Sequence, residues 1–310
     1  MIPEVERMTD LCVRLERDGI AYEEHCPLSP RGSFRIGGTA ALAVFPQSRE
    51  QLIRSLLLTR DAGCPYAVVG KGSNLLYPDG EYAGTVIFTG GVRELRVCGT
   101  GITASAGLSL PALALRARDA ALTGLEFAAG IPGTLGGAVF MNAGAFGGCM
   151  EQVVLRSEFW DARDGCCGCL EGGAQEFSVR SSIYMREARY TILGAVLELR
   201  EGNQEEIGSR MEDYRRRRSA TQPLGLPNAG SIFRHPPGHF AGRLIEDCGL
   251  KGVCVGGAAV SEKHAGFIVN RGGATAHDVL ALIDLIRERV LRQTGIALEC
   301  ELRRLDGRSI

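Results

Sequence analysis

The apolar positions in the first half of the chain follow two kinds of spacing. Apolar residues three or four positions apart predict helices over residues 4–18, 49–62 and 110–120. Short apolar runs predict strands over residues 66–69, 85–89, 95–98 and 102–106. This half of the chain therefore mixes helices with strands.

In the second half the pattern changes twice. Residues 152–200 alternate between apolar and polar, which predicts strands that include 153–159 and 191–199 and places Arg180 on a strand. Helical spacing returns over residues 205–218, 241–248 and 276–293, and Gly249 follows the short helix as a C-terminal cap would. The composition shifts beyond Gln222, so we place a domain boundary between residues 205 and 220. A chain of 310 residues suggests two or three domains.

The bulk composition narrows the class of protein. The formal net charge is −1, which argues against a basic nucleic-acid binder. The start, MIPEVERMTD, has early charges and no apolar run, so no signal peptide is predicted. No stretch approaches the roughly 20 apolar residues of a membrane span. We therefore expect a cytoplasmic protein without membrane insertion or a nucleic-acid partner.

Cysteines form one conspicuous cluster, at Cys166, Cys167 and Cys169. A second pair of ligands at zinc spacing is missing, so we expect no metal there. The polar, glycine-containing stretch around the cluster, DARDGCCGCLEGG, predicts the tip of a hairpin. In a reducing compartment all 11 cysteines should be thiols.

Glycine, at 42 residues, stands well above its usual share and concentrates in two motifs. The first is AVVGKGSNLL, residues 67–76, in which an apolar strand runs into Gly70, Lys71, Gly72, Ser73 and Asn74. Backbone N–H groups that converge in such a loop bind anions. The spacing matches neither a Walker loop nor a Rossmann fingerprint. The alternative is an ordinary tight turn.

The second motif is GLEFAAGIPGTLGGAVFMNAGAFG, residues 124–147. Its glycines stand at 130, 133, 136, 137, 144 and 147. Small residues at these positions leave the backbone open to a flat or extended ligand. A packed turn beside a helix is the alternative explanation.

Three polar positions outside the glycine motifs are candidates for chemistry. Arg180 has the planar fork that matches a carboxylate, although a lone arginine on a strand usually faces solvent. Ser231, after Gly230, is a possible proton donor, although Gly-Ser is also common turn chemistry. Glu299 and Glu301 alternate on the terminal strand, and only one of them should face an interior site. The arginines at 215–218 are expected to form a solvated helix end.

Taken together, these segments resemble the UDP-N-acetylenolpyruvoylglucosamine reductase family nearly from end to end. The resemblance is carried by residues 33–38, 70–74, 129–147, 222–224 with 230–231, 241–252 and 265–279. It implies an α+β fold with a two-part FAD-binding domain of the vanillyl-alcohol-oxidase (PCMH) type and a smaller α+β substrate-binding domain. The implied division is a FAD-binding region at 1–205, split near 78–85, a substrate-binding domain at 206–300, and a tail at 301–310 that returns to the FAD-binding region.

The resemblance also implies the ligands. Residues 70–74 would hold the FAD pyrophosphate, and the segment 128–137 would line the rest of the cofactor. The cofactor-binding candidates are therefore Gly70, Lys71, Gly72, Ser73, Asn74, Ala128, Gly130, Ile131, Pro132, Gly133, Gly136 and Gly137. For the UDP-sugar substrate the candidates are Arg217, Gln222, Asn228 and Lys251.

The implied reaction reduces UDP-N-acetylglucosamine enolpyruvate to UDP-N-acetylmuramate, a step of peptidoglycan synthesis. NADPH would reduce the flavin, and flavin N5 would deliver hydride to C3 of the enolpyruvyl group. Arg180 matches the family arginine that stabilises the enolate, Glu301 the assisting glutamate and Ser231 the serine that protonates C2. Glu299 is the second choice for the glutamate.

Two positions depart from the family pattern. Val179 stands where many relatives have tyrosine, and His235 stands where asparagine is frequent. The short span from Arg180 to Gln222 resembles the more compact of the family's two types, and we expect a monomer. Two rival interpretations share the glycine motifs: a FAD enzyme that oxidises an alcohol or hydroxy acid, and a flavin-binding regulatory protein without turnover.

Overall fold

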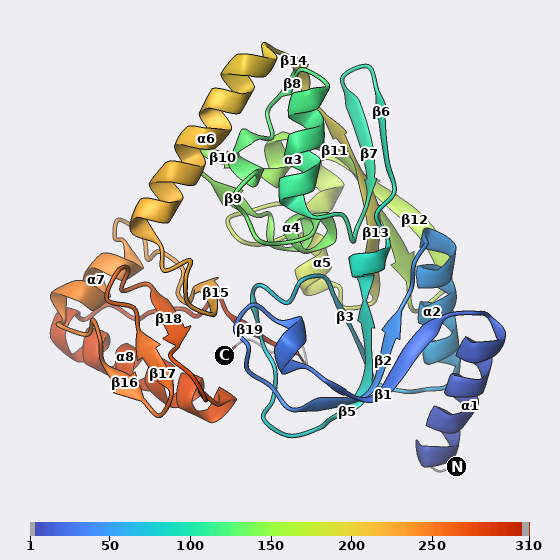
Figure 1. Cartoon of the computed structure of the whole chain (residues 1–310), viewed down its shortest axis with the longest axis horizontal. Helices are drawn as coiled ribbons and strands as arrows, with labels where there is room; N and C mark the ends of the chain where they lie inside the picture. Colours follow the sequence, from blue (N-terminus) through green and yellow to red (C-terminus); the bar gives the residue numbers. More distant parts are fainter. Residues whose placement is uncertain (1–3, 306–309) are drawn as a thin grey trace. The chain divides into compact units, whose positions relative to one another are not determined.

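A computed structural model describes residues 4–305 and residue 310 of the protein. Figure 1 labels its helices and strands. The chain forms two compact units, each built from separate stretches of sequence. The first unit takes residues up to Glu24, Leu42–Lys71 and Gly84–Arg217, and the second takes His25–Ala41, Gly72–Ala83 and everything from Arg218 on.

The first unit begins with a four-stranded sheet in the order β1-β2-β5-β3. Its strands are β1 (Ala21–Pro27), β2 (Thr39–Phe45), β5 (Tyr82–Phe88) and β3 (Tyr66–Val69). Two helices share its apolar core, α1 (Glu4–Arg17) and α2 (Arg49–Asp61). Ser48 caps α2 by accepting a hydrogen bond from Gln51 N–H at 3.2 Å. The residue ranges of β1, β2 and β5 cross the boundary between the units.

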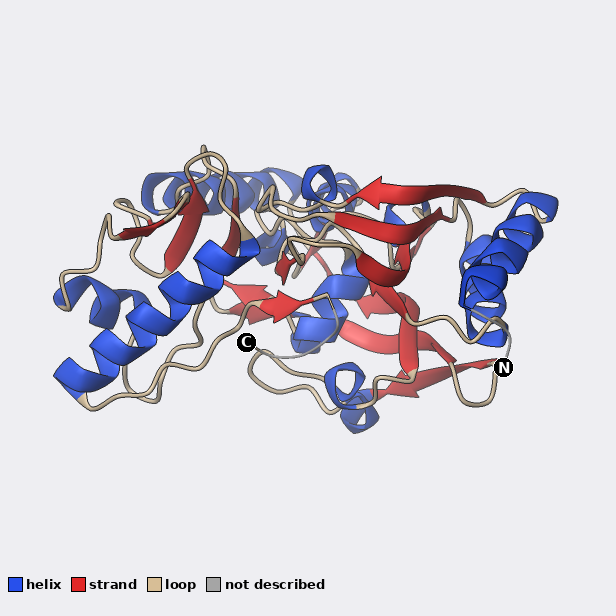
Figure 2. Ribbon diagram, turned by 90° about the horizontal axis from the view of Figure 1, so that it is seen from below, coloured by secondary structure: helices blue, strands red, loops and turns tan. Residues whose placement is uncertain are grey.

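A second, five-stranded sheet is antiparallel and lies wholly in the first unit, in the order β12-β11-β13-β7-β6. Its strands are β6 (Leu95–Cys98), β7 (Gly101–Ser105), β11 (Val154–Asp161), β12 (Cys166–Glu171) and β13 (Tyr190–Glu198). Helices α3 (Leu110–Asp119) and α4 (Leu135–Met141) pack into the same core, and α5 (Ile183–Arg186) is a single turn. Figure 2 separates these strands from the helices by colour.

The predicted hairpin is present, with its tip inside the stretch DARDGCCGCLEGG and the cysteine cluster just after it on β12. Cys166 pairs with Asp161 and Cys169 with Glu158 across β11 and β12, which leaves residues 162–165 as the tip. All three thiols are exposed. Within residues 4–305 and residue 310, no group of three or more His, Cys, Asp or Glu side chains has an arrangement that could hold a metal ion.

Short elements and one long helix complete the first unit. The short strands are β8 (Leu122–Thr123) with β14 (Arg200–Glu201), and β9 (Gly144–Ala145) with β10 (Gly148–Cys149). The unit also has the 3₁₀ turns η2 (Thr89–Gly91), η3 (Glu126–Ala128), η4 (Met150–Gln152) and η5 (Gly172–Gln175), whereas η1 (Ser29–Arg31) lies in the second unit. Helix α6 (Gln204–Thr221) is mostly polar, and its buried residues are Ile207 and Met211. The unit boundary falls inside α6, between Arg217 and Arg218.

The second unit is built on a four-stranded sheet in the order β15-β18-β17-β16. These strands are β15 (Asn228–Ser231), β18 (Phe267–Asn270), β17 (Ala258–Val260) and β16 (Cys254–Val255). Helices α7 (Ala241–Asp247) and α8 (Ala276–Thr294) contribute to its core. Thr275 and Asp278 form a capping box at the start of α8, and Gly295, at φ +73°, ends it. Two further strands, β4 (Leu75–Leu76) and β19 (Arg303–Arg304), pair in parallel.

Early residues supply part of the second core. Phe34, Ile36 and Leu76 pack among the buried side chains of residues 229–302. Each unit therefore combines stretches that are far apart in the sequence. The chain passes from the first unit to the second within α6, which is later than residue 205. The expected division into 1–205, 206–300 and 301–310 concerns which ligand each part binds, and it stays a prediction.

Candidate active site

The first glycine motif meets the second at Gly70. A Cβ built on Gly70 would overlap Thr134 Oγ1 and lie 3.0 Å from Thr134 Cγ2. Thr134 is buried, and its hydroxyl caps α4 by accepting a hydrogen bond from Gly137 N–H at 3.4 Å. Glycine at 70 thus allows the strand end to lie directly against the start of α4, and the structure brings the two motifs together within the first unit.

Gly72 needs to be glycine for two reasons. Its φ is +57°, in the left-handed region, and a Cβ there would lie 2.5 Å from the hydroxyl of Tyr77. Ser33 N–H donates to the carbonyl of Gly72 at 3.4 Å, which fixes the loop within the second unit. Burial raises the pKa of Tyr77, so its hydroxyl stays neutral at physiological pH.

The backbone donors of the two motifs are used differently. Among the hydrogen bonds that residues 4–305 and residue 310 make outside helices and strands, none is donated by the N–H of Lys71, Gly72 or Ser73. In the second motif, by contrast, Ile131, Gly133 and Gly136 donate to carbonyls of the same unit at 3.0, 2.8 and 2.8 Å. The first motif therefore offers amide donors for an anion, and the second offers backbone without side chains.

Those properties fit a dinucleotide cofactor. Consecutive free N–H groups suit phosphate oxygens, and exposed surface remains at Gly130–Gly133 and at Gly136 and Gly137 for a flat ring system. Ala128 differs from these residues because it is fully buried in the core. Ala128 therefore has no exposed surface of its own, and its assignment to the cofactor site stays a prediction.

Arg180 lies in a tight turn, so its placement on a strand was wrong. Ser178 and Ser181 exchange two backbone hydrogen bonds of 3.1 Å, and Val179 and Arg180 form the turn between them. The φ of Arg180 is +54°, a conformation that costs a non-glycine residue energy. Its guanidinium Nη2 donates to the carbonyl of Gly144 at 3.3 Å. Val179 is 86% exposed and contributes little packing to the turn.

Ser231 ends strand β15, next to an irregularity in the sheet. Gly230, at φ +79°, shifts the register between Asn228 and Ser231, and Ser231 pairs with Phe267 of β18. The Asn228 side chain shapes this bend, because its Nδ2 donates to the carbonyls of Pro223 and Leu226 and its Oδ1 accepts from Gly230 N–H. Ser231 is half-buried at the end of the bend.

Glu301 lies beside the chain that follows Ser231. Its N–H donates to the carbonyl of Ile232 at 2.7 Å, and Asn74 Nδ2 donates to its carbonyl at 3.1 Å. Between the two tail glutamates, burial raises the pKa of the Cys300 thiol to about 11, so this cysteine is not a thiolate at neutral pH. The second unit therefore brings Ser231, Glu301 and Asn74 onto adjoining stretches of backbone.

Glu299 is distinguished from Glu301 by its surroundings. Glu299 is paired with Arg234 at 3.0 Å, and its side chain is 71% exposed, whereas Glu301 is half-buried. These contacts favour Glu301 as the functional glutamate. Arg180 belongs to the first unit and Ser231 and Glu301 to the second, so the meeting of all three over one substrate stays a prediction.

The four substrate-binding candidates differ in how their polar atoms are engaged. Arg217 is exposed and paired with Asp213 at 2.7 Å, and Lys251 is paired with Glu246 at 2.7 Å. The Asn228 amide is used by its own loop. Gln222 Oε1, in contrast, is buried and without a hydrogen-bond partner among the described residues. The contacts thus favour Gln222, and all four assignments stay predictions.

Two arginines near the tail, Arg234 and Arg303, were not selected as candidates from the sequence. Arg303 follows Glu301 by two residues, and burial together with the charge of Arg234 lowers its pKa. Arginine stays charged in proteins, so Arg234 and Arg303 place positive charge beside the tail. For Arg303, its place two residues after a candidate glutamate was the available signal, whereas local sequence gave none for Arg234. His235 is one of the two departures from the family pattern. Its Nδ1 accepts a hydrogen bond from Ala241 N–H at 3.3 Å, and its ring packs edge-on against exposed Phe240.

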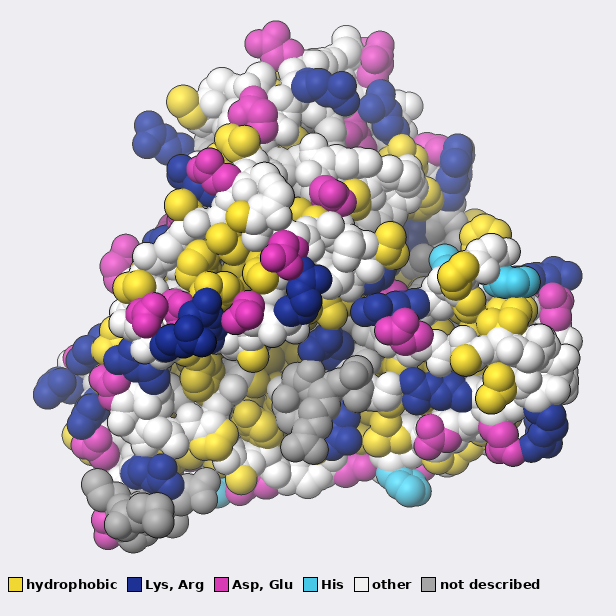
Figure 3. Space-filling model, turned by 180° about the vertical axis from the view of Figure 1, so that it is seen from behind, with side chains coloured by type: hydrophobic (Ala, Val, Ile, Leu, Met, Phe, Trp, Pro, Cys, Tyr) yellow, Lys and Arg dark blue, Asp and Glu magenta, His cyan; other side chains and the backbone are white. Residues whose placement is uncertain are grey.

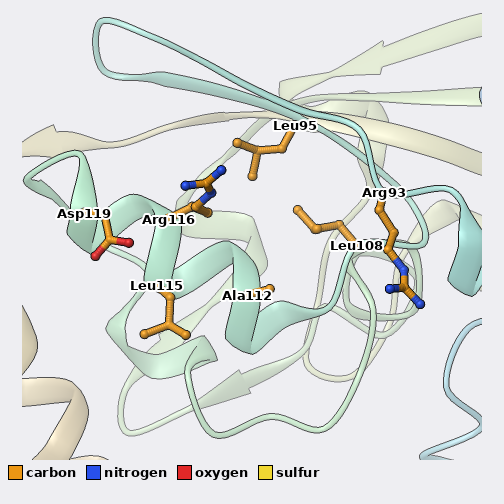
Figure 4. A pocket seen from close by; sticks show the side chains of 7 residues that line it. All are labelled: Arg93, Leu95, Leu108, Ala112, Leu115, Arg116 and Asp119. Atoms are coloured by element: carbon orange, nitrogen blue, oxygen red, sulfur yellow. The ribbon is translucent and has the colours of Figure 1, made fainter.

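A surface hollow elsewhere holds none of these residues. It has a volume of about 490 Å³ and is lined by residues of α3, by Leu95 of β6, and by Arg93 and Leu108 of the adjoining loops. Figure 4 shows its lining, which includes Leu95, Leu108 and Arg116. The hollow is wide open to solvent, so we assign it no role. On the face drawn in Figure 3, acidic and basic side chains are interspersed.

Comparison with known proteins decides between the candidate chemistries. Residues 222–305 match the C-terminal domain of UDP-N-acetylenolpyruvoylglucosamine reductase, and residues 40–167 match a FAD binding domain. A UDP-N-acetylenolpyruvoylglucosamine reductase of Caldanaerobacter subterraneus is 43% identical over 298 residues, which is 96% of this chain and 98% of that protein. The chain belongs to the UDP-N-acetylenolpyruvoylglucosamine reductase family.

Further members of the reductase family agree. The Moorella thermoacetica protein of the same name is 48% identical over 276 residues, 89% of this chain and 90% of its own. The crystal structure of the Thermus caldophilus reductase superposes with a TM-score of 0.77 at 34% identity, covering 92% of this chain and 98% of that one. The predicted family, fold class and flavin dependence are thereby confirmed. None of the helices in the described part of this reductase is long and apolar enough to cross a membrane.

The Gly70–Thr134 contact predicts a large effect of a small substitution. Gly70→Ala should destabilise the protein by about 1–3 kcal/mol, because the new methyl group overlaps the buried cap of α4. It should also release FAD more readily, since the two motifs are forced apart. Urea unfolding and the flavin absorbance retained after gel filtration measure both effects. Gly90→Ala is the matched control, because a Cβ at Gly90 has no atom within 4 Å. Equal stability and equal flavin content in the two variants would contradict this account.

Proposed function

We propose that this reductase converts UDP-N-acetylglucosamine enolpyruvate to UDP-N-acetylmuramate with NADPH, in the cytoplasmic part of peptidoglycan synthesis. The observation that carries the proposal is the convergence of Ser231 and Glu301 on adjoining backbone, from segments far apart in the sequence. The names of the relatives support the substrate. The expected cytoplasmic location and monomeric state remain part of the proposal.

The residues assigned to FAD divide by chemistry. The N–H groups of Lys71, Gly72 and Ser73 would bind the pyrophosphate, and Gly70 and Asn74 would fix the ends of that loop. Gly130, Ile131, Pro132, Gly133, Gly136 and Gly137 would leave room for the rest of the cofactor, and fully buried Ala128 would support this segment from the core. When bound, the flavin supplies the hydride that NADPH has delivered to it.

The chain's own residues are assigned to stabilise the developing charge and to supply the proton. Addition of hydride at C3 of the enolpyruvyl group pushes negative charge onto the carboxylate, and Arg180 is assigned to stabilise that charge. Ser231 is assigned to donate the proton that C2 takes up, which completes the saturation of the double bond. Glu301 is assigned to assist the enolate while protonated or hydrogen-bonded. Gln222 is the favoured contact to the UDP-sugar, ahead of Arg217, Asn228 and Lys251.

NADPH oxidation by the purified flavoprotein tests this function. We expect rapid consumption of NADPH with UDP-N-acetylglucosamine enolpyruvate and only slow consumption with UDP-N-acetylglucosamine, which lacks the double bond. Equal rates with the two sugars would overturn the substrate assignment. Reduction of the flavin by an alcohol or hydroxy acid instead would establish the rival FAD-dependent oxidoreductase.

The two tail glutamates provide a paired prediction. Glu301→Gln should lower kcat for the enolpyruvyl substrate by roughly 10–100-fold, since it changes a group assigned to the developing charge. Glu299→Gln should change kcat by less than about twofold, because Glu299 is exposed and an exposed ion pair contributes little. Steady-state kinetics of both variants at saturating NADPH checks the pair. A larger loss in Glu299→Gln would exchange the two roles.

A further inference from the structure

The short turn that carries Arg180 is attached at three points to the end of helix α4 and the residues that follow it. Asn142 Nδ2 donates to the carbonyl of Ser178 at 3.0 Å, at the beginning of the turn. Ser182 Oγ donates to the carbonyl of Phe140 at 2.7 Å, at its end. The guanidinium of Arg180 itself donates to the carbonyl of Gly144. Asn142 and the carbonyl groups of Phe140 and Gly144 all lie in the last turn of α4 or just after it.

Asn142 is unusual among these attachments. It ends α4 at φ +43° and ψ +54°, a left-handed conformation, and its side chain is buried, at 4% exposure. Asparagine tolerates this conformation better than most residues do. Its Oδ1 also accepts from Glu151 N–H at 2.9 Å, and its Nδ2 lies 3.3 Å from Glu151 Oε2. The amide therefore holds the loop that follows α4 and the Arg180 turn at the same time.

Glycine or aspartate would meet only part of these demands. Glycine adopts the left-handed conformation but has no side chain to reach Ser178. Aspartate has the right size and could accept from Glu151 N–H, but a carboxylate cannot donate to the carbonyl of Ser178. Its charge would also face the Glu151 carboxylate. The amide donor is thus the property that no small replacement supplies.

Helix α4 joins this turn to the cofactor segment. Its N-cap residue Thr134 lies against Gly70, and its C-cap residue is Asn142. Seven helical residues extend about 10 Å, which is a short and rigid distance. One end of α4 is therefore set by the glycine motifs and the other sets the Arg180 turn.

We propose that Asn142 is a positioning residue for Arg180, and that its side-chain amide holds the guanidinium where it can contact the substrate carboxylate. The proposal rests on the proposed role of Arg180. The strained φ of Arg180 supports it, because an energetically unfavourable turn persists only where its surroundings hold it in place.

Asn142→Asp tests the proposal in the flavin-loaded enzyme. With the flavin reduced beforehand by dithionite, reoxidation by the enolpyruvyl sugar nucleotide should slow by roughly 10–100-fold, since small misplacements of a catalytic group cost that much. Reduction of the flavin by NADPH should stay within about twofold of the wild-type rate, because Arg180 has no assigned part in it. Stopped-flow absorbance separates the two half-reactions. Asn142→Gly, which keeps the backbone conformation, should show the same pattern if the aspartate variant folds poorly.

A matched control uses the same substitution elsewhere. Asn203 Oδ1 accepts hydrogen bonds from Glu205 N–H and Glu206 N–H. A carboxylate oxygen can accept the same bonds, so Asn203→Asp should leave both half-reactions unchanged. A readout independent of turnover is amide hydrogen exchange in residues 178–182, which should quicken in Asn142→Asp and not in Asn203→Asp. Unchanged exchange in both variants would overturn the proposal.

A double variant separates this proposal from the role of Arg180. Asn142→Asp should slow reoxidation no further once Arg180 is alanine, because residues that act as one unit are not additive. Additive losses, or equal slowing of both half-reactions in Asn142→Asp, would overturn the positioning role while leaving Arg180 in place. If the single variant Arg180→Ala were reoxidised at the wild-type rate, both the role of Arg180 and the role of Asn142 would be wrong.

Discussion

Ser231→Ala is expected to separate the two halves of the catalytic cycle. Reduction of the flavin by NADPH should stay near the wild-type rate, because no proton for the sugar nucleotide is needed at that stage. Reoxidation by UDP-N-acetylglucosamine enolpyruvate should slow by roughly 10²–10⁴-fold, the usual worth of a positioned proton donor. Rapid mixing of pre-reduced enzyme with substrate, followed at the flavin absorbance, measures the second rate directly.

The structure supplies the reasons to expect a clean result. Ser231 is half-buried at the end of β15, where Gly230 and the Asn228 side chain set the bend. Removing one hydroxyl leaves those backbone contacts in place, so the fold should be unaffected. Ser209→Ala, at an exposed position of α6, is the control for the substitution itself. Equal slowing of both half-reactions, or no slowing of either, would show that the proton comes from another group.

Arg180→Ala is expected to impair the same half-reaction by roughly 10²–10³-fold, because the developing charge on the carboxylate loses its partner. Arg180→Lys should recover part of that rate, since an ammonium keeps the charge but lacks the planar fork. Alanine and lysine both carry a Cβ, so either would meet the same strain at φ +54°, and their comparison isolates the side-chain charge from the backbone strain. The measurement is again reoxidation of the pre-reduced enzyme, with kcat and KM determined separately.

A nearby arginine serves as the control for this series. Arg186 is exposed and paired with Glu176 on the surface, close in sequence to Arg180. Arg186→Ala should therefore leave both half-reactions unchanged. If Arg186→Ala slowed reoxidation as much as Arg180→Ala did, general loss of positive charge would explain the effect, and the specific role of Arg180 would be wrong.

Much of the fold is visible in local spacing. The helices predicted at 4–18, 49–62, 110–120 and 276–293 end within one residue of α1, α2, α3 and α8, because their apolar stripes are regular. The strands at 66–69 and 95–98 coincide with β3 and β6. Periodicity records which face of an element is buried, and it therefore locates long, amphipathic elements well.

Other features depend on partners that local spacing does not record. The Arg180 turn exists because Ser178 and Ser181 pair with each other and because Asn142 and Phe140 hold its ends. The polar cysteine segment is a strand because β11 offers it a paired edge. Similarly, the distinction between Glu299 and Glu301 follows from Arg234 and Asn74, which come from other segments. The candidate site could be named from motifs, while its internal contacts required the tertiary structure.

The composition of the second core has a consequence for synthesis on the ribosome. Phe34, Ile36 and Leu76 emerge early, but the side chains that bury them come from residues 229–302. Until those later residues are made, the nascent chain must leave apolar side chains in water, where they invite association with other chains. This unit can thus finish folding only after residues 229–302 have been made, and the growing polypeptide should be a client of chaperones until then.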